Sequence, residues 1–111
     1  MGKNFILKDS GKRKTYPSGA VRDTNEGKIR YDLIPIECLK RLAELYTKGA
    51  VKYGDNNWKK GMPTKDYVER VCRHWANYRL GEKEEDNLSA VVFNIFGIIY
   101  NEEMENKQNQ I

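Results

Sequence analysis

The sequence predicts a small all-α domain, in which three main helices follow an irregular N-terminal segment. Apolar residues recur every three or four positions in three stretches, and glycine or proline residues separate those stretches. With 111 residues the chain is too short for a second hydrophobic core, so we expect one domain. Only 39% of the residues are apolar and 32% are charged, which predicts a thin core and favours a homo-oligomer.

The N-terminal part of the chain is basic, and glycine and proline residues interrupt any regular secondary structure there. Residues 1–18 are expected to form a flexible basic arm. Residues 19–35 mix charges with Tyr31, Leu33 and Ile34, which predicts an ordered loop or a short strand. The net charge of +4 comes from this part, while acidic residues dominate the later half. That asymmetry favours a local phosphate site and argues against nucleic acid as a partner.

The first helix is expected to begin near Pro35, because proline suits a first turn, and to end at Gly54. Its apolar stripe comprises Cys38, Leu39, Leu42, Leu45, Tyr46 and Ala50. Gly49 costs about 1 kcal/mol relative to alanine inside a helix, so it predicts a close packing contact or a change of direction. The stretch that follows, residues 55–63, is a turn-rich loop that carries Trp58.

The second helix is expected to run from Thr64, its N-cap, to about Leu80. One face carries Val68, Val71, Cys72 and Trp75, and another carries Tyr67, Arg70, His74 and Asn77. The third helix follows the break at Gly81 and carries Leu88, Val91, Val92, Ile95, Ile98 and Ile99. Because it is apolar over much of its circumference, the other helices or a second chain must cover it. Residues 105–111 are expected to form a polar tail, which leaves residues 19–104 as the helical domain.

The sequence gives no sign of a membrane or secreted protein. Its longest apolar stretch, residues 88–100, is too short to cross a bilayer, and the N-terminus lacks a hydrophobic signal core. Cys38 and Cys72 lack metal-ligand spacing. We therefore expect a cytoplasmic protein with inert thiols.

Carboxylates gather between the second and third helices, at Glu82, Glu84, Glu85 and Asp86. Such oxygen-rich clusters suit Mg²⁺, but acidic residues are also favoured at a solvated helix N-terminus, without any metal. His74 lies one helix earlier, and it is either a hydrogen-bonded structural residue or a ligand or proton-transfer group.

The stretch KYGDNNW, residues 52–58, places a lysine, aromatic rings and amides around a glycine. Such a loop can hold a phosphate and cover a base, or it can cap the helix and anchor the turn to the core.

Three motifs occur in order along the chain: GAVRDTNEGKIRYDLIP, LKRLAELYTKGAVKYGDNNWKKGMP, and RHW followed by GEKEEDNLSAVVFN. In this succession the chain closely resembles the phage dATP/dGTP diphosphohydrolase family, which is related to MazG-type pyrophosphohydrolases. The resemblance covers roughly residues 19–103. It implies a MazG-like helical oligomer that handles nucleotides and splits a purine deoxynucleoside triphosphate, dGTP or dATP, into monophosphate and pyrophosphate with Mg²⁺.

The resemblance also implies which residues form the site, in the cytoplasm of a bacterial host. Substrate would be bound by Arg22, Lys28, Arg30, Lys52, Tyr53, Asn57, Trp58, Arg73 and Asn94. Glu82, Glu85 and Asp86 would hold Mg²⁺, and His74, Glu85 and Asp86 would be catalytic.

Two other functions remain open. The first is a phage nucleotide sponge, which sequesters a cyclic or signalling nucleotide from bacterial immunity without cleaving it. Such a protein needs the aromatic and cationic residues but no metal that activates water. The second is a structural or interaction protein whose charged clusters are only solvated surface.

Overall fold

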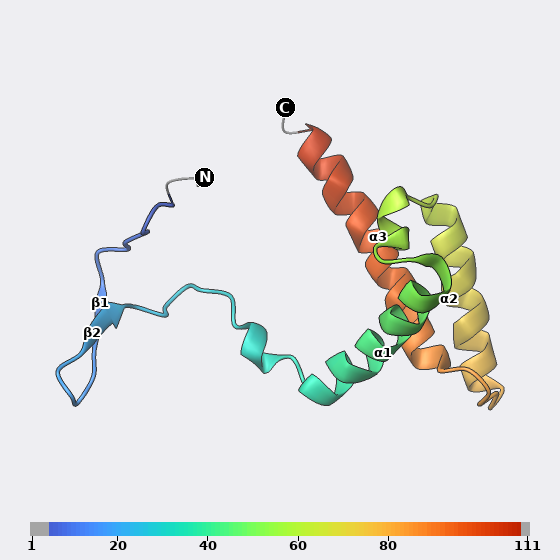
Figure 1. The fold of residues 1–111 in the computed structure, drawn as a ribbon, viewed down its shortest axis with the longest axis horizontal. Coiled ribbons are helices and arrows are strands. Elements are labelled where there is room, and N and C mark those ends of the chain that lie inside the picture. Colours follow the sequence, from blue (N-terminus) through green and yellow to red (C-terminus); the bar gives the residue numbers. More distant parts are fainter. Residues whose placement is uncertain (1–4, 110–111) are drawn as a thin grey trace. The chain divides into compact units, whose positions relative to one another are not determined.

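The computed structural model describes residues 5–109, which Figure 1 colours from blue to red. The chain divides into two compact units, Met1–Leu33 and Ile34–Ile111, and each is described by itself. The arm and the tail predicted from the sequence include residues 1–4 and 110–111, which lie outside the described residues. The described chain is mostly helical and has the three helices that the sequence predicts.

The N-terminal unit contains a small antiparallel hairpin, drawn in blue in Figure 1. Strand β1, Arg13–Thr15, pairs with strand β2, Val21–Asp23. The turn is closed by Gly19, at a φ of 91°, whose N–H donates to the Tyr16 carbonyl oxygen at 2.8 Å. Strand β1 was not predicted from the sequence, because three exposed residues without apolar alternation carry no strand pattern.

Helix α1 spans Ile36–Tyr53, after a 3₁₀ turn, η1, at Tyr31–Leu33. Pro35 is its N-cap and Gly54 its C-cap, as predicted, and Gly54 takes a φ of 94° that suits a residue without Cβ. The helix is continuous through Gly49, where an added Cβ would meet nothing within 4 Å. The close packing contact expected at Gly49 is therefore not found.

Helix α2 spans Thr64–Arg79, and its N-cap is Pro63 instead of the predicted Thr64. The Thr64 hydroxyl does not cap the helix, and accepts a hydrogen bond from Asn101 Nδ2 at 3.0 Å. Gly81, at a φ of 83°, then begins the turn into the next helix.

Helix α3 spans Asn87–Asn109, so the helix continues into the stretch expected to be a polar tail. It packs antiparallel to α2, because Thr64 lies beside Asn101 near one end of α2 and His74 lies beside Asn87 near the other. Figure 1 shows these two helices side by side. No helix among the described residues is long and apolar enough to cross a membrane.

The face of α2 that packs inward is not the one its most apolar residues suggest. Tyr67 is only 3% exposed, whereas Val68 and Trp75 are each 46% exposed. The reason lies on α3, where Gly97 has no side chain and leaves room for the Tyr67 ring. The Tyr67 and His74 face therefore turns inward, and the predicted apolar face of α2 stays largely exposed.

The same inversion occurs on α3. Its buried residues are small or polar: Asn87, Ser89, Ala90 and Asn94. Its large apolar side chains, Val92, Ile95, Phe96 and Ile99, are 39–48% exposed. Within the helical unit, an apolar stripe of α3 therefore stays uncovered.

Candidate functional site

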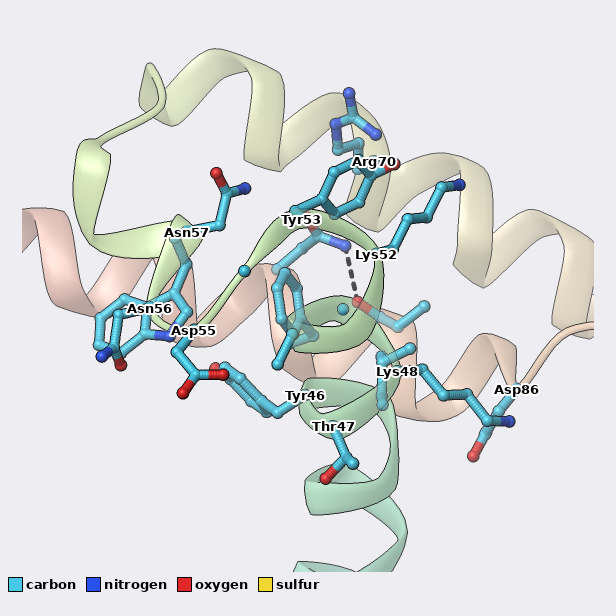
Figure 2. Close-up of a pocket in the computed structure, with 18 of the residues that line it drawn as sticks. Tyr46, Thr47, Lys48, Lys52, Tyr53, Asp55, Asn56, Asn57, Arg70 and Asp86 are labelled. Carbon is cyan, nitrogen blue, oxygen red and sulfur yellow. Dashed lines mark hydrogen bonds between the residues drawn. The ribbon is translucent and has the colours of Figure 1, made fainter.

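A pocket of about 760 Å³ lies in the helical unit (Figure 2). Its walls come from the C-terminal half of α1, from the turn that leads into the 3₁₀ helix η2 at Asn57–Lys60, and from α2 and α3. The turn depends on Gly54 and on Asn56, which takes a left-handed φ of 60°. Asparagine tolerates this conformation better than most residues, so the sequence favours a tight return of the chain here.

Aromatic residues form one side of the pocket. The Tyr46 and Phe93 rings are tilted, with centroids 4.6 Å apart, which joins α1 to α3. The Trp58 ring lies edge-on to Tyr46 at 6.4 Å and to Tyr100 at 5.0 Å. These contacts fix the position of the indole, while Tyr53 stays 58% exposed. The pocket can thus offer a rigid aromatic surface to a planar ligand.

Three cations line the same pocket: Lys48, Lys52 and Arg70. Figure 2 shows Lys52 and Arg70 on the same side of the pocket as Tyr53. The lysines are four residues apart and therefore share one face of α1. None of the three forms an ion pair with any residue in the described range 5–109. Their charges are therefore available to an anionic ligand.

Many of the residues predicted from the sequence meet at this pocket. Lining it are Lys52, Tyr53, Asn57, Trp58, His74, Glu85, Asp86 and Asn94. Arg73 and Glu82 do not line it. Arg73 forms an ion pair with Glu69 one turn earlier on α2, on the exposed side of the helix.

The predicted cations of the N-terminal segment belong to the other unit. Lys28 lies 3.6 Å from the Asp23 carboxylate, and Arg30 pairs with Asp32 at 2.6 Å. Arg22 sits opposite Lys14 in the hairpin. Within their own unit, Lys28 and Arg30 line a second hollow.

Asp86 holds the start of α3. Its carboxylate accepts from the Ser89 N–H at 3.1 Å and from the Ser89 hydroxyl at 2.7 Å, as an N-cap does. Both oxygens also accept from the Arg41 guanidinium at 2.6 Å, a bidentate pair that ties α1 to α3. The bonds from Arg41, followed by those from Ser89, lower the pKa of Asp86 to about 2.

Next to Asp86, three side chains form a continuous hydrogen-bonded series. Asn87, only 2% exposed, donates from Nδ2 to Glu82 Oε2 at 2.7 Å. Its Oδ1 lies 2.8 Å from His74 Nδ1. The Asn87 bond, with the backbone N–H groups of Glu84 and Glu85, lowers the pKa of the Glu82 carboxyl below its ordinary value.

The carboxylates of this region do not fit a metal centre as they are arranged. The Asp86 carboxylate already accepts hydrogen bonds from Arg41 and Ser89. The Glu82 carboxylate already accepts them from Asn87 and from backbone N–H groups. Within residues 5–109, no group of three or more His, Cys, Asp or Glu side chains is placed to hold a metal ion. Glu85 has a carboxylate without a side-chain hydrogen bond in that range, but one ligand does not make a site.

Sequence reasoning missed four residues that shape the pocket or its supports: Lys48, Arg70, Arg41 and Asn87. Helical spacing gave a signal for two of them, because Lys48 precedes Lys52 by four residues and Arg70 precedes His74 by four. The Arg41 and Asn87 contacts had no such signal, because they depend on how α1, α2 and α3 pack.

A family model described as the dATP/dGTP diphosphohydrolase N-terminal domain matches residues 18–111. No curated protein and no solved structure matches the chain. The matched range includes the whole pocket and strand β2.

Proposed function

Since this chain belongs to the dATP/dGTP diphosphohydrolase N-terminal family, we propose that it binds a purine deoxynucleoside triphosphate in the pocket. We propose further that it hydrolyses this nucleotide to monophosphate and pyrophosphate. One observation carries this proposal. Lys48, Lys52 and Arg70 line one pocket without carboxylate partners in the described chain, beside a fixed aromatic surface. A nucleotide has the matching parts, a polyanion joined to a planar ring.

The cations suit the phosphate chain. The planar Arg70 guanidinium can bond two phosphate oxygens at once, while the lysine ammonium groups act as point charges. Asn56 and Asn57, on the turn at the other side of the pocket, can bond polar edges of the base or sugar. The exposed Tyr53 ring can stack on the base, beside the Trp58 indole that Tyr46 and Tyr100 hold in place.

The proposed reaction needs a water molecule at the α-phosphorus. A bond forms from the water oxygen to that phosphorus, and the bond from phosphorus to the oxygen shared with the β-phosphate breaks, which releases pyrophosphate. His74 and Glu85 line the pocket and can accept the proton of the water. Arg70 and the two lysines would neutralise the charge that develops on the departing pyrophosphate.

A requirement for Mg²⁺ stays a prediction, because the carboxylates of residues 5–109 do not fit a metal centre as they are arranged. The hydrogen bonds that these carboxylates already accept also favour a second candidate function. A protein that captures a nucleotide without cleaving it needs the free cations and aromatic rings, but not a set of unengaged carboxylates. Capture would use the same pocket.

One experiment separates the two. The purified chain is incubated with dGTP, dATP and cyclic dinucleotides, with and without Mg²⁺, and native and heat-denatured mixtures are chromatographed. Monophosphate and pyrophosphate from dGTP or dATP are the expected result. A nucleotide that leaves solution and returns unchanged after denaturation would establish capture, and neither result with any nucleotide would refute both functions.

A further inference from the structure

The series Glu82, Asn87 and His74 contains a buried amide held between two different partners. The direction of the hydrogen bond between Asn87 and Glu82 is fixed, because a carboxylate held by backbone N–H groups can only accept hydrogen bonds. If the Asn87 amide were flipped, its oxygen would face Glu82 Oε2 at 2.7 Å, oxygen against oxygen. The amide nitrogen must therefore point to Glu82.

This orientation dictates the other end of the series. With its nitrogen toward Glu82, Asn87 presents its oxygen to His74 Nδ1 at 2.8 Å. An amide oxygen can only accept, so Nδ1 must carry the hydrogen. In the neutral ring Nε2 is then the nitrogen with the lone pair.

We propose that Glu82, acting through Asn87, holds His74 in the tautomer with hydrogen on Nδ1, so that Nε2 serves as the acceptor in the pocket. His74 lines the pocket, and no residue in the range 5–109 hydrogen-bonds its Nε2. Glu82 and Asn87 are thus positioning residues. This gives Glu82 a role other than the metal ligand predicted from the sequence.

The tautomer matters for the pocket's chemistry, and this step rests on the proposed function. A lone pair on Nε2 can accept a proton from the attacking water or a hydrogen bond from an N–H or O–H of the nucleotide. A hydrogen on Nε2 would make the same atom a donor. The series therefore sets which groups of a ligand His74 recognises, whether the nucleotide is cleaved or only captured.

The test uses the fact that the chain contains a single histidine. Two-bond ¹H–¹⁵N correlation spectra of the untagged, ¹⁵N-labelled chain are recorded without nucleotide, at about pH 8, where an imidazole in water is neutral. We expect a protonated Nδ1 and an unprotonated Nε2, the opposite of the tautomer that free histidine favours. A spectrum with hydrogen on Nε2 would overturn the proposal.

Glu82→Gln tests the source of the orientation. A glutamine at this position keeps its oxygen toward the backbone N–H groups of Glu84 and Glu85 and presents its NH2 group to Asn87. The Asn87 amide should then flip, and the spectrum should shift toward hydrogen on Nε2. Glu84→Gln is the matched control, since it removes an exposed carboxylate from the same turn and should leave the Nδ1–H tautomer unchanged. An unaltered tautomer in Glu82→Gln would refute the role of Glu82, and circular dichroism confirms that both variants are folded.

Asn87→Leu gives a second, independent variant, because leucine has a similar volume but offers no acceptor to His74 Nδ1. The spectrum should shift toward hydrogen on Nε2, the tautomer that free histidine favours. A wild-type tautomer in a folded Asn87→Leu variant would refute the role of Asn87. Because every spectrum is recorded without nucleotide, these outcomes are separate from those of the turnover and capture assay.

Discussion

At the residue scale, Arg70 and Arg73 provide an internal comparison within α2. Arg70 lines the pocket and has no ion-pair partner in the described chain, whereas Arg73 is paired with Glu69. If phosphate binds in the pocket, Arg70→Ala should raise the Kd for dGTP about tenfold, equivalent to about 1.4 kcal/mol. Isothermal titration calorimetry measures this change.

Arg73→Ala is the control for that prediction, because it removes the same charge from the same helix. Its Kd should stay within about twofold of the wild-type value, since a paired and exposed arginine adds only long-range charge that salt screens. Equal losses in the two variants would show that net charge, and not the pocket, determines nucleotide affinity.

How much of the site the sequence could predict depends on where each residue's partners lie. Lys52, Tyr53, Asn57 and Trp58 follow one another along a short stretch, so the motif alone placed them together. The role of Asp86 could not be predicted in this way. Its partner Arg41 is 45 residues away, and only the packing of α1 against α3 brings them together.

At the element scale, the Arg41 and Asp86 pair joins α1 to the first turn of α3. The pKa of Asp86 falls to about 2, below the unfolded value of about 3.9. A lowered pKa adds stability that is present above about pH 4 and lost as the pH falls toward 2. The side chain is 31% exposed, so after solvent screening we expect a contribution of roughly 1 kcal/mol.

Asp86→Asn tests this contribution, since asparagine still caps a helix but cannot form the ion pair. The free energy of unfolding by urea should be lower than in the wild type by about 1 kcal/mol at pH 7, and the difference should shrink below about pH 4. Glu102→Gln, an exposed carboxylate on α3, should have no effect. A difference that is independent of pH would mean that the charge of Asp86 is not the cause.

Two glycines in helices should respond to alanine with opposite signs. A Cβ on Gly97 would collide with the buried Tyr67 ring, while one on Gly49 would meet nothing within 4 Å. Gly97→Ala should therefore lose about 1–3 kcal/mol of unfolding free energy, even though alanine favours helices. Gly49→Ala should gain up to about 1 kcal/mol. Thermal and urea unfolding measure both, and a gain for Gly97→Ala would contradict the contact between α2 and α3.

The glycine at residue 97 also explains why the sequence predicted the helices better than their packing. Apolar spacing located all three helices, and Pro35 and Gly54 fixed the start and end of α1. The same spacing placed Val68 and Trp75 on one apolar face of α2, but both are 46% exposed and it is Tyr67 that is buried. A prediction from apolar periodicity depends only on where apolar residues recur. It therefore could not show that Tyr67 packs into the space that a glycine leaves.

At the scale of the whole molecule, the helical unit buries little apolar surface on its own. Among the described residues only Leu42, Tyr67 and Ala90 are buried apolar residues. Trp75 on α2 and Phe96 on α3 remain 46% exposed. An exposed apolar surface of this kind is typical of a protein interface. Residues 87–101 of α3 carry no charge, so two copies could pair along this helix without repulsion.

We therefore expect a homo-oligomer whose mass is a multiple of 13.0 kDa, measured by size-exclusion chromatography with light scattering. Ile95→Glu places a charge in the exposed apolar stripe of α3 and should shift the population toward 13.0 kDa, because an interface does not tolerate an unpaired charge. Gln108→Glu adds the same charge to an exposed polar position of the same helix and should leave the mass unchanged. A wild-type mass of 13.0 kDa at high protein concentration would show that this stripe does not join copies of the chain.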